Sequence, residues 1–152
     1  MIERFERFSS AVSSVYRYIQ KIEREEMEKQ GLKGAFAQYL MALHRNPTGM
    51  TASQLCEECD MNKAAVSRAI GEMEECGLVT KHSDGDSAYR ALLFLTERGR
   101  QVVQFVYARG VIAVEKGGEG LSEEKRRVFY EALKLIECNL QRVCQDGLPE
   151  EQ

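Results

Sequence analysis

Two cysteines have the spacing of a chemically active pair. Cys56 and Cys59 lie three residues apart, as redox-active or zinc-binding thiols often do, but the chain has no second pair of similar spacing. Residues three apart share one face of a helix, and this face also holds Leu55. A free cysteine packs like a small hydrophobic residue. We therefore expect both cysteines to pack in the core, with thiol-based redox sensing as the alternative.

Metal binding and catalysis lack the residues they would need. His44 and His82 are the two histidines of the chain, too few for a zinc site built on nitrogen ligands. The sequence has no Gly-rich phosphate loop, no Gly-x-Ser-x-Gly elbow and no His-Glu-x-x-His motif. We expect no metal, no cofactor and no enzyme activity.

A third group of residues has side chains suited to nucleic acid. A helix is predicted from residue 63 to residue 75, and its first half has a polar, basic side. Amides, hydroxyls and cationic groups are the donors that bind base edges and phosphates. The residues assigned to this surface are Asn62, Lys63, Ser67 and Arg68. The residues that recur at helical spacing on the opposite, inward side are Val66, Ala69, Ile70 and Met73.

Capping residues define the elements that would position this polar surface. Thr51 and Gln54 have the spacing of a capping box at the start of a short helix. Asn62 can cap the next helix through the backbone N–H of Ala65, and Gly77 can end it in a left-handed conformation. This pattern predicts a helix-turn-helix, which places its second helix in the major groove of DNA.

A two-stranded hairpin is predicted directly after this unit. The first strand starts at Leu78-Val79, residues 84–86 (Asp-Gly-Asp) form the turn, and residues 89–95 return. A helix-turn-helix followed by such a hairpin is a winged helix. The hairpin residues assigned to DNA and its backbone are Lys81, His82 and Arg90.

Charge is distributed unevenly along the chain. The formal net charge is −3, which is not typical of a DNA-binding protein as a whole. Between Asn62 and Arg100, however, three of the six acidic residues lie at the far end of the predicted second helix, so the start of that helix and the base of the hairpin remain basic. A local positive potential is what phosphate contact requires.

Composition also bounds the location of the protein. No apolar run approaches the ~20 residues of a membrane span, and the N-terminal residues mix charges unlike a signal peptide. Five cysteines without a secretory segment indicate reduced thiols. We therefore expect a cytoplasmic protein with no membrane partner.

Long amphipathic helices are predicted on both sides of the winged helix. Residues 1–30 and 117–147 are assigned to a helical dimerisation region, residues 35–100 to the DNA-binding domain, and residues 97–116 to a connecting helix. The predicted fold is mostly α with a small β-wing. A long amphipathic helix cannot bury its apolar stripe alone, so we expect a homodimer, with an intramolecular bundle as the alternative.

These motifs together resemble the MarR family of bacterial transcriptional regulators over nearly the whole chain. The matching segments are residues 51–57 (Thr-Ala-Ser-Gln-Leu-Cys-Glu), 66–68 (Val-Ser-Arg), 75–79 (Glu-Cys-Gly-Leu-Val) and 95–99 (Leu-Thr-Glu-Arg-Gly). The resemblance implies an obligate homodimer that binds a short inverted repeat in double-stranded DNA. It also implies repression that a small aromatic effector, a metal or thiol oxidation relieves.

The hairpin departs from the family pattern. Members commonly carry an Asp followed by two arginines ahead of the Leu-Thr pair, where this chain has Ser87, Ala88 and Tyr89. Arg90 falls one position later, and neighbouring strand residues point to opposite faces. A winged-helix module that binds proteins without binding an operator is therefore an alternative function.

The resemblance further implies an effector pocket between the DNA-binding lobe and the dimerising helices. The residues placed on helices that border this cleft in the family are Tyr16, Tyr39, His44 and Tyr107. Ordinary core and interface packing is the alternative role for these side chains.

Overall fold

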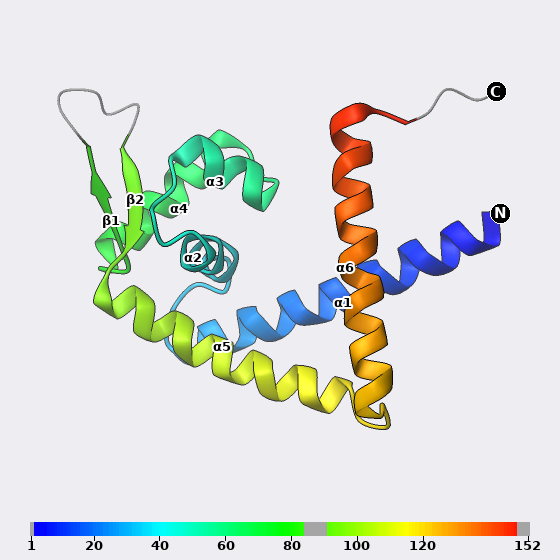
Figure 1. Ribbon diagram of the computed structural model, residues 1–152. Coiled ribbons are helices and arrows are strands. Elements are labelled where there is room, and N and C mark those ends of the chain that lie inside the picture. The colour runs from blue at the N-terminus through cyan, green and yellow to red at the C-terminus, as the bar shows by residue number, and fades with distance from the viewer. Residues whose placement is uncertain (1, 84–90, 149–152) are drawn as a thin grey trace. The chain divides into compact units, whose positions relative to one another are not determined.

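The computed structural model describes residues 2–83 and 91–148, which form six helices and two strands (Figure 1). In chain order these are α1 (Ile2–Lys29), α2 (Phe36–Arg45), α3 (Ala52–Cys59), α4 (Lys63–Glu75), β1 (Val79–His82), β2 (Leu92–Leu95), α5 (Glu97–Gly117) and α6 (Glu123–Asp146). The chain divides into two compact units, Met1–Ala113 and Val114–Gln152, with the division inside α5. The predicted mostly helical fold with a small β-wing is confirmed.

The first unit has one hydrophobic core to which all of its helices and strands contribute. In β1 the contribution comes from Val79, whereas Lys81 and His82 are exposed. Fully buried side chains come from α1, α2, α3, α4, β2 and α5, and α2 packs against α1, α3 and β2 (Figure 1). The largest of them are Met27, Leu40, Leu55, Met73, Leu78, Leu93, Val66, Val103 and Val106. The inward face predicted for α4 is confirmed, because Val66, Ala69, Ile70 and Met73 are all buried.

The hairpin is antiparallel and is anchored to the loop before α3. Val79 pairs with Leu95 and Lys81 pairs with Leu93. Leu93 also pairs with Met50, donating to its carbonyl at 2.8 Å and accepting from its N–H at 3.2 Å. The return strand was predicted to start at Tyr89, and its regular part is Leu92–Leu95. The predicted turn, Tyr89 and Arg90 lie outside the described residues.

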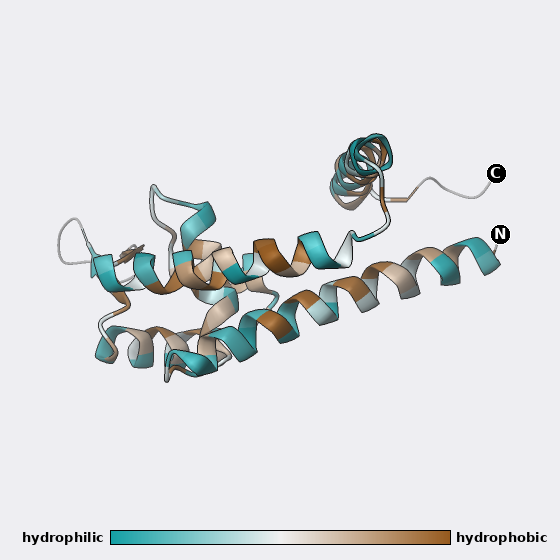
Figure 2. Cartoon of the chain, turned by 90° about the horizontal axis from the view of Figure 1, so that it is seen from below, coloured by the Kyte–Doolittle hydropathy of each residue, from teal (hydrophilic) through white to brown (hydrophobic). Residues whose placement is uncertain are grey.

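Helix α1 has an apolar stripe that its own unit does not cover. Its buried residues are Glu26 and Met27, near its end, whereas apolar residues along the rest of the helix are exposed (Figure 2). The Glu26 carboxylate forms ion pairs with Lys29 in α1 and with Arg109 in α5, at 3.3 Å for Arg109. The hydrogen bond from Lys29 lowers the pKa of Glu26, so this buried carboxylate stays charged and ties α1 to α5.

The second unit consists of the end of α5, a short turn and α6. Ser122 caps α6 by accepting from the Lys125 N–H at 3.3 Å. Arg126 donates to the Gly118 carbonyl at 3.0 Å and so closes the turn. None of the residues of α6 is buried, although the helix carries a row of apolar side chains. Of the helices described, none is both long enough and apolar enough to span a membrane.

Candidate nucleic-acid interface

Local capping fixes the angle between α3 and α4. Thr51 and Gln54 form the complete capping box, with the Thr51 N–H donating to the Gln54 side chain at 2.8 Å. Asp60 ends α3 in the left-handed conformation (φ 50°), and Asn62 caps α4 by accepting from the Ala65 N–H at 2.9 Å. The predicted helix-turn-helix is therefore present, with short polar side chains making the turn.

The first half of α4 presents an exposed polar surface. Lys63, Ser67 and Arg68 are exposed in the first half of α4, and Asn62 is exposed at its cap. The Arg68 Nε donates to the Ala64 carbonyl at 3.3 Å, a contact within its own helix that leaves the rest of the guanidinium open to other partners. The structure brings these four predicted residues together on one face, at the positive end of the helix dipole.

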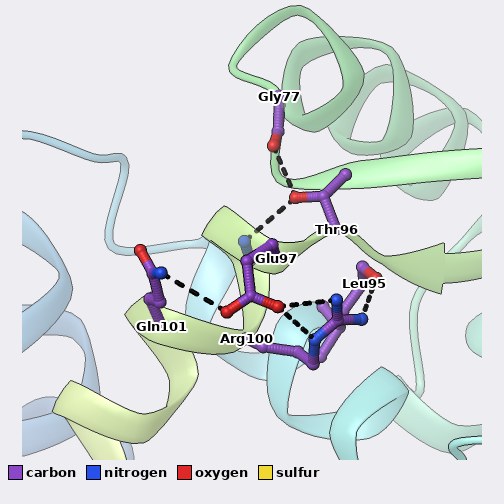
Figure 3. Close-up of polar contacts among 7 residues, drawn as sticks. Gly77, Leu95, Thr96, Glu97, Arg100 and Gln101 are labelled. Atoms are coloured by element: carbon purple, nitrogen blue, oxygen red, sulfur yellow. Dashed lines mark hydrogen bonds and ion pairs between the residues drawn. The ribbon is translucent and has the colours of Figure 1, made fainter.

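The residues that directly follow α4 are held by Thr96, just before α5, and by the first turn of α5. The Thr96 hydroxyl donates to the Gly77 carbonyl at 2.6 Å, and the Thr96 N–H donates to the Leu78 carbonyl at 3.0 Å (Figure 3 shows the hydroxyl contact). Arg98 Nη1 donates to the Cys76 carbonyl at 2.8 Å. These bonds satisfy carbonyls that the end of a helix would leave without partners. The orientation of α4 is thus fixed at both ends.

The same junction holds α5 at its start. The Gly99 N–H donates to Thr96 Oγ1 at 3.0 Å, which makes Thr96 the N-cap of α5 (Figure 3). Arg100 donates to the Leu95 carbonyl at 2.9 Å and to the Glu97 carboxylate at 2.8 Å. Hydrogen bonding to Arg100 lowers the pKa of Glu97, so the pair remains ionised at the base of the hairpin.

Gly99 is the tightest contact of this junction. A Cβ at this position would lie 2.1 Å from the Leu78 carbonyl oxygen and 3.3 Å from the Leu95 side chain. The nearest atom belongs to the backbone and cannot rotate away. Glycine is therefore required here by the close approach of α5 to the chain that follows α4.

The two described wing residues of the predicted set have partners within the protein. Lys81 Nζ lies 2.7 Å from Oε2 of Glu74, near the end of α4. The His82 ring packs edge-on against Phe94, with 5.4 Å between the ring centroids. Arg90, the third predicted wing residue, lies outside the described residues.

Two of the four predicted effector residues lie together. The rings of His44 and Tyr107 lie with their centroids 6.1 Å apart and their planes tilted by 56°, and both residues are exposed. Tyr39 is buried in the core, where desolvation raises the pKa of its phenol. Tyr16 is exposed on α1 and its hydroxyl accepts from the Gln20 side chain at 2.8 Å. The structure thus gathers His44 with Tyr107 but places Tyr39 and Tyr16 elsewhere.

The two spaced cysteines pack against the core. Cys56 and Cys59 are half-buried, and Cys59 Sγ lies 3.7 Å from the Gln38 carbonyl as a weak donor. Burial, aided by the charge of Glu58, raises the pKa of Cys59 to about 11. Among the residues that the structure describes, no three His, Cys, Asp or Glu side chains cluster closely enough to hold a metal ion.

This environment makes Cys59 a poorly reactive thiol. We expect iodoacetamide at pH 8 to alkylate Cys59 at least about a hundredfold more slowly than an unperturbed thiol, because the thiolate is the nucleophile and a raised pKa removes it. Peptide mass spectrometry of the folded chain measures the rate, with exposed Cys138 as the internal comparison. Equal rates at Cys59 and Cys138 would support the redox alternative instead.

Several contacts of this site were not predicted from the sequence. Glu74 and Lys81 are seven residues apart across a turn, and Arg98 bonds to a carbonyl 22 residues earlier. Neither pair lies within a single helix or strand, so no helical or strand period brings its members together. The sequence pattern of residues 95–99 (Leu-Thr-x-x-Gly) does not reveal which groups Thr96 binds. Its bonds to the chain after α4 depend on the tertiary fold.

Comparison with known proteins supports the same fold. Residues 30–88 match the model of the MarR family, and no curated protein sequence matches significantly. A MarR transcriptional regulator from Methanosarcina mazei Go1 is 23% identical with a TM-score of 0.79, over 91% of this chain and 99% of that one.

Two further structures contain DNA. One, described as a MarR family transcriptional regulator from Listeria monocytogenes with a 26mer DNA, is 21% identical with a TM-score of 0.73, over 94% of this chain and 97% of that one. A mutant of S. aureus MepR bound to an oligodeoxyribonucleotide is 16% identical with a TM-score of 0.59, over 88% and 97%. At these identities the likeness concerns the fold. The family match over residues 30–88 adds that this segment of the chain is similar to the MarR family model.

Proposed function

We propose that this protein is a sequence-specific DNA-binding transcriptional regulator that acts in the cytoplasm as a homodimeric repressor. The observation that carries the proposal is the exposed polar face of α4, held at a fixed angle by caps at its start and by Thr96 and Arg98 at its end. A rigidly held helix with a free polar face is what groove binding requires. Two proteins with this fold have been solved with bound DNA, which supports DNA as the partner.

Within this proposal the residues have distinct roles. Lys63, Ser67 and Arg68 contact base edges and phosphates from α4, and Asn62 contacts a phosphate beside its cap. Lys81, His82 and Arg90 supply the wing and backbone contacts. Output as a repressor, rather than an activator, follows the common behaviour of the family.

The homodimer is supported by apolar surface that each unit leaves exposed. Phe5 in α1 is 71% exposed and Leu140 in α6 is 50% exposed, and both belong to apolar stripes that run along their helices. Exposed stripes of this length are unusual for a monomeric protein. A second copy offers the same stripes, and twofold symmetry matches an inverted-repeat site.

An effector would bind beside the one aromatic pair that the predicted pocket retains. The exposed rings of His44 and Tyr107, tilted by 56° to each other, offer aromatic contacts to a small aromatic molecule, with a ring nitrogen and a phenol as hydrogen-bonding groups. Titration of the folded protein with salicylate-like phenols, followed by DNA affinity, tests this role. If the phenol changed the DNA affinity of the Tyr107→Ala variant as much as that of the wild type, these residues would have no role in effector binding.

Selection from random double-stranded DNA tests the proposed function. We expect the enriched sites to be pseudo-palindromes with half-sites ~10 bp apart, and the affinity to fall steeply with salt because bound phosphates release counterions. Absence of an enriched inverted repeat would favour a protein-interaction module on the same fold.

Arg68→Ala is expected to weaken binding to the selected site by at least about fivefold, or ~1 kcal/mol, through loss of a base or phosphate contact. Arg127→Ala is the matched control, because it removes the same charge from an exposed position on α6 whose ion pair is with Glu131 of the same helix. Fluorescence anisotropy at fixed salt measures both. An equal loss in the two variants would assign the effect to net charge and not to α4.

A further inference from the structure

The ion pair between Glu74 and Lys81 joins the proposed DNA-reading helix to the wing. Lys81 pairs across the hairpin with Leu93, which is buried, and directly paired residues share one face of a sheet. The Lys81 side chain therefore leaves the strand on the side that faces α4. Its Nζ lies 2.7 Å from Glu74 Oε2, and the two side chains are 47% and 32% exposed.

The neighbouring acids of α4 differ from Glu74 in their partners. Glu72 pairs with Lys33 at 2.7 Å, before α2 and away from the wing. Glu75 is exposed and forms no ion pair with any residue that the structure describes. Glu74 is thus the acid of α4 that engages a cation of the proposed DNA surface, and its carboxylate has the charge and hydrogen-bonding geometry of a phosphate oxygen.

We propose that Glu74 competes with DNA for Lys81 and thereby limits the affinity of this protein for DNA. In the free protein the Glu74 carboxylate forms an ion pair with the Lys81 ammonium group. When DNA binds, a backbone phosphate takes the place of the carboxylate beside Lys81. The inference rests on the proposed function, since it needs a DNA phosphate to reach the wing. An exposed ion pair is weak, so the exchange is feasible, but the carboxylate must be displaced each time.

A double-mutant cycle tests this competition. Glu74→Gln keeps the shape of the side chain and removes its charge, Lys81→Met removes the cation, and Glu75→Gln is the control with the same change in net charge one residue away. We expect Glu74→Gln to raise the affinity for the selected site about two- to fivefold, the worth of an exposed ion pair. Glu75→Gln should raise it less, through general repulsion alone.

The dependence on Lys81 is the decisive result. In the Lys81→Met background, Glu74→Gln should raise the affinity for DNA no more than Glu75→Gln does, because no ammonium group remains to be released. The salt dependence should also steepen in Glu74→Gln by up to ~0.9 in log–log slope, as one more cation becomes available to phosphate. Thermal unfolding of each variant verifies that it is folded.

Two failures can be told apart in this experiment. A wild-type chain without salt-dependent affinity for the selected DNA would overturn the proposed function and this inference together. If the wild type binds, three results would overturn the inference alone. Glu74→Gln could lower the affinity for DNA, or it could raise it no more than Glu75→Gln does. It could also raise the affinity by the same factor when Lys81 is replaced by methionine. In those cases the ion pair positions the wing instead of competing with phosphate.

Discussion

Gly99→Ala is expected to lower the free energy of unfolding by about 3 kcal/mol, the upper end of the usual cost of overpacking. The added methyl would lie 2.1 Å from the Leu78 carbonyl oxygen, so α5 must move away from the end of α4. That movement would also stretch the Thr96 bond to Gly77. Urea unfolding followed by circular dichroism measures the loss.

Gly71→Ala is the matched control for this substitution. Gly71 lies inside α4, and a Cβ there would meet nothing within 4 Å. Alanine at such a helical position should stabilise the protein by about 0.5–1 kcal/mol. If Gly99→Ala were as stable as the wild type, the close approach of α5 to Leu78 would not hold in solution.

Leu140→Glu is expected to leave the chain monomeric and to lower DNA affinity by about a hundredfold or more. The leucine lies on the uncovered apolar stripe of α6, and a carboxylate buried there in a dimer would cost several kcal/mol without a partner. A single DNA-reading helix would also contact one half-site in place of two. Light scattering and anisotropy on the same sample measure assembly and binding. Ile19→Glu in α1 should act in the same direction, because Ile19 belongs to the stripe of that helix.

Gln141→Glu provides the control for Leu140→Glu. It adds the same charge at the next position of α6, where the native residue is exposed and polar. We expect this variant to keep a mass of twice the 17.3 kDa chain. A wild-type protein that itself has the monomer mass at micromolar concentration would refute the proposed homodimer.

The helix boundaries could be predicted because short-range chemistry determines them. Thr51, Asn62, Thr96 and Ser122 all act as the caps that their spacing indicates, each by accepting an N–H three residues on. Helical periodicity likewise placed Val66 and its neighbours inside the core. Such features involve residues a few positions apart, so the sequence contains them in full.

The side-chain partners could not be predicted in the same way. Tyr39 and Tyr107 both lie on predicted helices, yet Tyr39 is buried in the core and Tyr107 is 55% exposed beside His44. Which face each helix turns inward depends on tertiary packing. The pairing of Lys81 with Glu74 depends in addition on the register of the hairpin, which sets the face from which the lysine leaves the strand.

The bonds that join Gly77 and Leu78 to Thr96 close the hairpin at its base. Residues 83–91, which connect β1 to β2, therefore begin and end at points that the rest of the fold already holds together. The entropy of closing a loop grows slowly, by about 0.6 kcal/mol for each doubling of its length. Insertions and deletions in this connection should be tolerated without changing the orientation of α4. The length of the wing and the DNA-reading surface of α4 can therefore evolve separately.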